Sequence, residues 1–307
     1  MLRQILVALL FSAAALPLSA QTNAAPGASA PVEQDGIFIH RDVVFGKGGG
    51  RDLHADLVWP MYAPKPMSAI IHIHGGGWVG GNYHWDSGQA NFARHGYFVA
   101  SIEYRLDGTA KWPAQIEDCK CAVRWLRANA LKCGIDPNRI GVIGESAGGH
   151  LATSVGVMGH VKGFEGDGGW PGVSSAVQCA VDYYGRMDLT QQGIFSAQAQ
   201  TYNLGLLGVP YAQNPALWLS ASPLHYVSPE CPPILIVQGD ADQLAPVQQS
   251  RAFAAALTKA GVPNRLIVVK NGTHGFVPLP GTTISPSLKE IDQATLDFFN
   301  KYLGAAR

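Results

Sequence analysis

The sequence predicts an α/β fold in which a mostly parallel, twisted sheet of about eight strands carries helices on both faces and a small helical cap. Short apolar runs alternate with helix-like patterns from residue 69 onward, as in sheets built by helical crossovers. Most of these runs are continuous, which is typical of strands buried on both faces. The connection 185–233 is long and rich in apolar residues, which favours an ordered cap over a flexible surface excursion.

The start of the chain resembles a secretory signal. Residues 1–20 hold an apolar stretch followed by the small residues Ser19 and Ala20. The competing interpretation is a membrane anchor, but the stretch is shorter than the roughly 20 residues that span a bilayer. We therefore expect export to the periplasm or the extracellular space, without a membrane anchor. Residues 21–35 are rich in Ala, Gly, Pro, Ser and Thr, which indicates a disordered tether.

The remaining residues, 36–307, are expected to form one domain, with 185–233 inserted as the cap. It should open with two antiparallel strands, 36–45 and 53–59, joined by a hairpin at Gly48-Gly49-Gly50. The further strands are expected at 69–74, 97–103, 139–143, 176–182, 234–238 and 265–269. The helices are expected at 85–95, 114–131, 147–158, 247–260 and 287–302.

Charge favours a neutral or small substrate. Lys plus Arg and Asp plus Glu both number 22, and the chain shows no basic run of the kind that nucleic-acid binding needs. We therefore expect no nucleic-acid partner.

The five cysteines are an odd number, so at least one thiol cannot pair within the chain. Cys119 and Cys133 are too far apart along one helix to bridge. Cys179 and Cys231 could form a disulfide between neighbouring strands, although two buried free thiols is the preferred interpretation. No spacing suggests a metal site, and no cofactor is expected.

The pentapeptide Gly144-Glu145-Ser146-Ala147-Gly148 lies between a short apolar strand and a helix-like run. A serine at such a turn presents its hydroxyl above the sheet, near the helix N-terminal amides. The alternative is an ordinary glycine-rich turn. The flanking elements make Ser146 a candidate nucleophile.

A serine nucleophile needs a base and an acid, and in a parallel sheet these should follow strand carboxyl ends. Asp240 and Asp242 both lie in the loop after strand 234–238, and either could be the acid. His274 follows the last strand and comes after both the serine and the acid. A surface histidine is the alternative, but this position makes His274 the candidate base.

The loop after strand 69–74 reads Gly75-Gly76-Gly77-Trp78. Consecutive glycines let backbone amides approach a substrate oxygen, so this loop is a candidate for stabilising an oxyanion. A plain flexible turn is the alternative.

Together these runs resemble the serine esterases of the α/β-hydrolase superfamily. The resemblance lies nearer to the branch of bacterial carbohydrate and feruloyl esterases, the BD-FAE-like proteins, and of hormone-sensitive-lipase-like enzymes. It covers nearly everything after Gly36. The motifs that carry it are HGGGW at 74–78, EYRL at 103–106, GESAGGHLA at 144–152, GDADQLAP at 239–246 and HGF at 274–276.

The resemblance implies an α/β-hydrolase fold and a triad of Ser146, His274 and Asp242, with Asp242 rather than Asp240 as the acid. It also implies an oxyanion hole made by the amides of three residues: Gly76, Gly77 and Ala147. A larger N-terminal helical cap, common in the lipase-like members, is missing here, which favours the carbohydrate and feruloyl esterases. The implied substrates are small acyl or aromatic esters, including carbohydrate-linked ones.

Several aromatic residues are expected near the catalytic face, where they would line a substrate pocket. Core or cap packing is the alternative for each. They are Trp78, Tyr183, Tyr184, Trp218 and Phe276. Glu103 and Arg105 are expected to form a structural ion pair behind the oxyanion loop.

Two other functions compete with ester hydrolysis. The same residues would serve an amide hydrolase, such as an aryl formamidase or a peptidase of this fold. A binding module that has lost catalysis is the non-enzymatic alternative, but such modules usually lack the serine or the histidine, and both are here.

Overall fold

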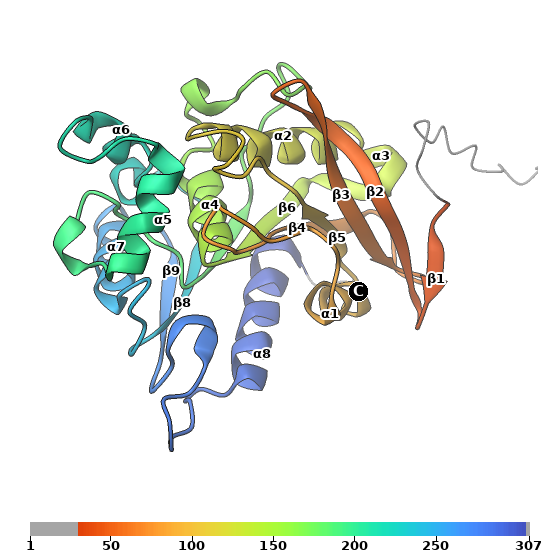
Figure 1. The fold of residues 1–307 in the computed structure, drawn as a ribbon. Coiled ribbons are helices and arrows are strands. Elements are labelled where there is room, and N and C mark those ends of the chain that lie inside the picture. The colour runs from red at the N-terminus through yellow and green to blue at the C-terminus, as the bar shows by residue number, and fades with distance from the viewer. Residues whose placement is uncertain (1–29, 305–307) are drawn as a thin grey trace, which may run out of the picture.

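The computed structural model describes residues 30–304, so the expected signal, residues 1–20, and most of the expected tether lie outside the described residues. One sheet of nine strands runs through this part of the chain, in the order β1-β2-β3-β5-β4-β6-β7-β8-β9 (Figure 1). The strands are β1 Val32–Gln34, β2 Ile37–Gly48, β3 Arg51–Pro60, β4 Met67–Ile73, β5 Phe98–Ile102, β6 Ile135–Glu145, β7 Cys179–Tyr183, β8 Ile234–Gly239 and β9 Asn264–Val269.

The first three strands pair antiparallel, and β3 also pairs antiparallel with β5. The six strands β4, β5, β6, β7, β8 and β9 run parallel to one another, as predicted from their continuous apolar runs. Gly49 and Gly50 both have positive φ and form the expected hairpin between β2 and β3.

The strand β1 lies inside the segment 21–35 that was expected to be a disordered tether, and so corrects that expectation. Val32–Gln34 form β1, which pairs with β2 in the register Val32↔Ile39. The side chains of β1 are exposed, so the strand is held by backbone hydrogen bonds to β2. For the same reason its sequence shows no apolar pattern that would predict a strand. The ordered fold therefore begins before Gly36.

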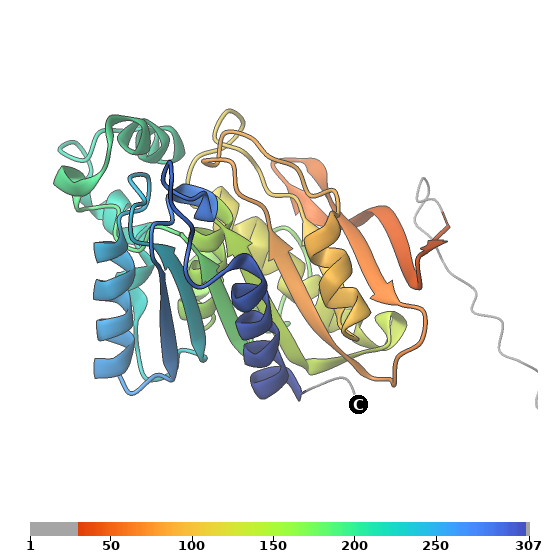
Figure 2. The same cartoon turned by 90° about the horizontal axis from the view of Figure 1, so that it is seen from below.

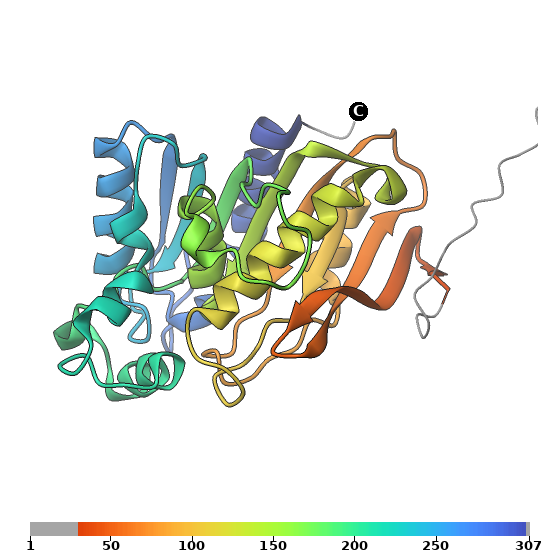
Figure 3. The same cartoon turned by 90° about the horizontal axis from the view of Figure 1, so that it is seen from above.

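Helices cover both faces of the sheet. They are α1 Ser87–Arg94, α2 Ala114–Ala128, α3 Ala130–Cys133, α4 Ala147–Val157, α5 Ala197–Leu207, α6 Pro215–Ser220, α7 Val247–Lys259 and α8 Leu288–Phe299. The helices α1 and α8 cover one face (Figure 2), and α2 and α4 cover the other (Figure 3). Ile70 belongs to the core under α1 and α8, while the next residue, Ile71, belongs to the core under α2 and α4. Because successive strand residues face opposite sides, the sheet separates two apolar cores. No helix within residues 30–304 is both long and apolar enough to cross a bilayer.

The insertion 185–233 is helical, as expected. It contains α5 and α6 and lies at the same end of the sheet as the loop after β9 (Figure 2). The ring of Tyr202 on α5 lies against Gly77, where an added Cβ would meet ring carbons at 2.9 to 3.1 Å. The cap therefore touches the loop that follows β4.

All five cysteines are free, and Cys179 and Cys231 are buried, in agreement with the preferred interpretation of these two as buried free thiols. Cys179 and Cys231 belong to the cores on opposite faces of the sheet, so they cannot bridge.

The expected ion pair between Glu103 and Arg105 is wrong. Arg105 Nη2 instead lies 2.7 Å from Asp118 on α2. Glu103 accepts from Arg51 Nη1 at 3.0 Å and pairs with His54 of β3. The two residues follow β5 closely and turn toward different neighbours.

Candidate active site

Ser146 lies in the sharp turn between β6 and α4, with φ 57° and ψ −116°. This strained conformation needs close packing of small neighbours. An added Cβ at Gly144 would overlap the carbonyl of Gly148, and one at Gly148 would overlap the carbonyl of Ile73. Ser146 N donates to Tyr183 O at 2.8 Å, which ties the turn to β7. The side chain of a partly exposed serine is thus held at the carboxyl end of the sheet.

The structure brings together the three predicted residues of the triad. His274 Nε2 lies 2.8 Å from Ser146 Oγ, and His274 Nδ1 lies 2.8 Å from Asp242 Oδ2. The serine and the histidine are 128 residues apart in the sequence. This arrangement is that of a nucleophile, a base and an orienting acid.

Asp242, and not Asp240, contacts the histidine. Asp242 is buried, whereas Asp240 is exposed. Asp242 Oδ1 accepts from the amides of Leu244 and Ala245, at 2.8 and 2.9 Å, and Oδ2 also accepts from Gln238 Nε2 at 3.0 Å. The carboxylate is therefore fixed on both oxygens while it faces His274.

The glycine loop after β4 has a defined shape. Gly76 and Gly77 have φ values of 112° and 62°, conformations that favour glycine. Val79 N and Gly80 N both donate to Gly76 O at 3.2 Å. The amides of Gly76, Gly77 and Ala147 donate to no acceptor within residues 30–304, so they are free to donate to a ligand.

A cavity of about 10 Å³ opens beside Ser146. Its lining residues are Gly77, Trp78, Ser146, Ala147, Tyr184 and Arg186. A larger cavity, of about 770 Å³, lies between α1, α8 and the turn, and its lining includes His72 and Glu145 but not Ser146. Ser146, whose hydroxyl contacts His274, lines the small cavity and not the larger one.

The aromatic residues divide into two groups. Trp78 and Tyr184 line the small cavity, and Tyr184 packs edge-on against His274, with ring centroids 4.9 Å apart. Phe276 packs behind Tyr184, with ring centroids 4.7 Å apart.

Three of the five predicted residues, Tyr183, Trp218 and Phe276, do not line the small cavity. Tyr183 directs its hydroxyl to Thr295 on α8, at 2.7 Å. Trp218 is buried within the cap, where its Nε1 donates to Val209 O at 3.0 Å. Tyr183 and Trp218 thus find their polar partners away from Ser146, and Phe276 packs behind Tyr184. The structure does not place these three at the small cavity, and Tyr183 lines the larger one.

Sequence reasoning missed three residues around the triad: Arg186, His150 and Gln238. Arg186 lines the small cavity and is 6% exposed. His150 is fully buried on α4, and burial lowers its pKa to about 4. Gln238 supports Asp242, as described above. The one available signal was the position of Arg186, which lies two residues after Tyr184, one of the aromatic residues expected near the catalytic face.

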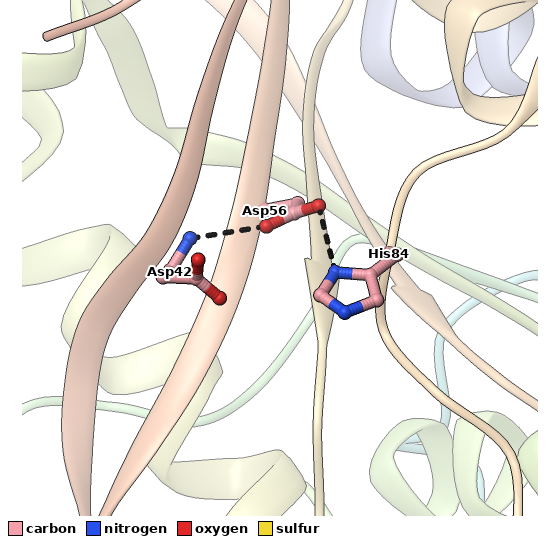
Figure 4. A group of neighbouring side chains, drawn as sticks. All are labelled: Asp42, Asp56 and His84. Atoms are coloured by element: carbon pink, nitrogen blue, oxygen red, sulfur yellow. Dashed lines mark hydrogen bonds and ion pairs between the residues drawn. The ribbon is translucent and has the colours of Figure 1, made fainter. Parts of the chain in front are cut away.

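Asp42, Asp56 and His84 form the one group of side chains among residues 30–304 whose ligand atoms lie close enough for a metal, within 4.8 Å of one another (Figure 4). Asp56 is already satisfied, because Oδ1 accepts from Asp42 N at 3.0 Å and Oδ2 lies 3.3 Å from His84 Nδ1. The group lies on the β2–β3 side, away from Ser146, and we assign no metal to it.

Comparison with known proteins shows what this chain is similar to. The family model named BD-FAE matches residues 55–257. Esterase LipQ of Mycobacterium tuberculosis is 31% identical over 267 residues, which cover 86% of this chain and 62% of the relative. Esterase LipC of the same organism is 32% identical over 71% of this chain and 52% of the relative. The matched regions thus span only about half to three fifths of these relatives.

Solved structures resemble this fold along most of its length. A truncated carbohydrate esterase from gut microbiota has a TM-score of 0.76 and 30% identity, covering 86% of this chain and 96% of its own. Est2, a thermophilic esterase of Thermogutta terrifontis with propionate bound, has a TM-score of 0.71 and 26% identity, covering 87% and 95%. An acetyl ester-xyloside bifunctional hydrolase of Caldicellulosiruptor lactoaceticus has a TM-score of 0.69 and 30% identity, covering 82% and 89%.

Proposed function

Because this chain belongs to the BD-FAE family and has the α/β-hydrolase fold of its esterase relatives, we propose that it is a serine carboxylesterase acting on short acyl esters. The observation that carries the proposal is the pair of 2.8 Å contacts that joins Ser146, His274 and Asp242. These contacts supply a nucleophile with a base and the base with an orienting acid, as ester hydrolysis through an acyl-enzyme requires.

In the proposed reaction, His274 Nε2 takes the proton of Ser146 as Oγ attacks the ester carbonyl. The amides of Gly76, Gly77 and Ala147 donate to the oxyanion that forms. His274 then protonates the leaving alcohol, and an acyl-enzyme remains on Ser146. A water molecule, deprotonated by His274, releases the acid. Asp242 keeps the histidine in the tautomer whose Nε2 accepts a proton.

The size of the cavity supports a short acyl group. About 10 Å³ of free space beside Ser146 is about the room that one water molecule needs, which leaves little space for a long acyl chain. The solved relatives point the same way, since one is a carbohydrate esterase and another an acetyl ester-xyloside bifunctional hydrolase. We propose acetyl esters, including acetyl groups carried by carbohydrates, as the substrate class.

The proposed enzyme works outside the cytoplasm. The signal-like residues 1–20 support export, and the catalytic domain is proposed to span 36–307, preceded by the strand β1. Its cap, 185–233, is proposed to close over the substrate.

The test is a substrate panel with purified protein. We expect wild-type protein to hydrolyse p-nitrophenyl acetate faster than the butyrate and octanoate, and to do so through Ser146. Ser146→Ala should lower kcat by about 10³-fold or more, because no other side chain at the turn can form the acyl-enzyme.

The matched control is Ser174→Ala, since Ser174 is exposed and precedes the amino end of β7, whereas Ser146 lies at the carboxyl ends of the strands. It should keep wild-type turnover. Methyl ferulate and an aryl formamide complete the panel. Turnover of p-nitrophenyl acetate that persists in Ser146→Ala would contradict the proposed role of Ser146. A preference for the formamide would indicate amide hydrolysis in place of ester hydrolysis.

A further inference from the structure

A buried arginine shares the small cavity with the nucleophile. Arg186 follows β7 closely, is 6% exposed and lines the cavity together with Ser146 and Ala147. Within residues 30–304 no carboxylate lies within ion-pair distance of its guanidinium. A buried charge without a counter-ion is costly, so this site favours a negative group that the described chain does not itself supply.

The fold holds this guanidinium by only two of its nitrogens. Nε donates to Leu244 O at 2.9 Å, and Nη1 donates to Asn203 Oδ1 at 2.6 Å and to Ala199 O at 3.3 Å. Nη2 donates to no acceptor in the described part of the chain. Arginine binds carboxylates through parallel N–H donors, and here one nitrogen is left free for that purpose.

The surroundings of Arg186 are rich in donors. Its Cζ lies 5.3 Å from the ring centroid of Trp78 and 5.7 and 5.9 Å from those of Phe195 and Tyr202. These rings hold the cation without neutralising it. Trp78 Nε1 and Asn203 Nδ2 are both buried N–H donors without an acceptor among the described residues. The cluster therefore offers several unpaired donors and no carboxylate of its own.

The carboxylate that acts on Arg186 electrostatically does not compensate its charge. Asp242 influences Arg186 electrostatically, but its two oxygens already accept from Leu244, Ala245 and Gln238 and face His274. Burial lowers the pKa of Arg186 to about 10, so the group is still a cation at neutral pH.

We propose that Arg186 determines specificity by binding a carboxylate carried by the ester substrate itself. The inference rests on the proposed esterase function and adds a substrate class to it, namely short esters with a carboxylate near the scissile carbonyl. The carboxylate belongs either to the acyl part or to the alcohol part, and the test separates the two. A purely structural arginine would account for the contacts of Nε and Nη1, but it would give no preference for anionic esters.

The test compares esters that differ only in charge. The acyl arm uses monoethyl malonate against ethyl malonamate, and the alcohol arm uses acetoxyacetate against acetoxyacetamide. Each kcat/KM is divided by the rate of alkaline hydrolysis of the same ester. We expect wild-type protein to prefer the carboxylate over the amide by about tenfold or more in one arm, since a charge-assisted hydrogen bond is made only to the carboxylate.

Variants assign this preference to Arg186. Arg186→Met should bring the ratio of anionic to neutral kcat/KM close to one, and Arg186→Lys should restore part of it. The matched control is Arg127→Met, because Arg127 is also bonded only to carbonyl oxygens but lies near the amino ends of β6 and β7, away from Ser146. It should keep the wild-type ratio. A wild-type ratio near one in both arms overturns the inference, as does an unchanged ratio in Arg186→Met.

A binding measurement covers the case in which Arg186→Met does not fold. Malonate and malonamide are titrated into the Ser146→Ala protein, which cannot turn over an ester. Tighter binding of malonate supports the inference, and equal affinities count against it. The proposed esterase function is tested separately from the role of Arg186. Turnover of the neutral acetate ester that does not depend on Ser146 overturns the esterase proposal. Turnover that depends on Ser146 but shows no preference for a carboxylate overturns only the role of Arg186.

Discussion

Each oxygen of Asp242 has a separate task. Oδ1 accepts from the amides of Leu244 and Ala245, while Oδ2 faces His274 Nδ1 at 2.8 Å. Two backbone donors thus fix which oxygen turns to the histidine. An exposed acid such as Asp240 has no such constraint. Orientation, more than charge alone, therefore distinguishes the two aspartates.

This orientation predicts the effect of Asp242→Asn. The amide oxygen should stay with the two backbone donors, which places the NH₂ group opposite His274 Nδ1. The histidine would then carry its proton on Nε2 and could not accept one from Ser146. We expect kcat for p-nitrophenyl acetate to fall by about 10³ to 10⁴, with KM little changed.

Steady-state kinetics on Asp242→Asn and Asp240→Asn would check this prediction. Asp240→Asn should behave as wild type, because this exposed side chain does not contact the triad. Equal losses in both variants would contradict the assignment of Asp242 as the acid.

At the scale of elements, the helix α5 packs against the glycine loop, whose Gly77 and Trp78 line the small cavity beside Ser146. The ring of Tyr202 packs where a side chain at Gly77 would lie, and it faces Arg186. The loop comes from the carboxyl end of β4 and the helix from the insertion after β7. The loop that lines the cavity is therefore backed by a helix that is distant in the sequence, and we expect this contact to limit the length of acyl group that fits.

Tyr202→Ala should relax this limit. Removing the ring opens space beside Gly77, so the ratio of kcat/KM for butyrate to that for acetate should rise by about tenfold, in the range that one or two methylenes contribute in a pocket. The p-nitrophenyl ester series measures it. Tyr202→Phe keeps the ring and should keep the wild-type ratio. An unchanged ratio in Tyr202→Ala would mean that another residue limits the acyl group.

At the scale of the whole molecule, His150 links the catalytic region to stability. It is fully buried, its Nε2 lies 2.8 Å from Ala221 O, and it packs against the rings of Trp78 and Trp112. Burial, together with the nearby charge of Arg186, lowers its pKa from 6.5 to about 4. The folded protein therefore keeps His150 neutral at pH values where the unfolded chain protonates it.

This difference predicts a loss of stability in acid. Between pH 6.5 and 4 the unfolded state binds more protons at this residue, so the free energy of unfolding falls as the pH falls, by up to about 1.4 kcal/mol per pH unit. His150→Gln keeps a donor for Ala221 O but cannot be protonated. Urea unfolding at several pH values should show a shallower acid dependence in this variant.

The control for this measurement is His95→Gln, which alters an exposed histidine after α1. It should follow the acid dependence of the wild-type protein. Parallel curves for wild type and His150→Gln would show that His150 is not the source of the slope.

The sequence by itself determined the parallel sheet and the places of Ser146, His274 and the acid loop. Continuous apolar runs can be buried only between helices, and parallel strands bring their carboxyl ends to one edge. From the residues alone, both Asp240 and Asp242 remained possible acids. The strand β1 was missed, because it is held by backbone bonds and carries exposed side chains.

Only the tertiary structure decided where side chains point and what surrounds them. Tyr183 and Trp218 turn to partners on α8 and in the cap, while Arg186 turns toward Ser146. The size of the cavity likewise depends on how the cap packs on the glycine loop. These outcomes arise from contacts between segments far apart in the chain, which local patterns of residues do not encode.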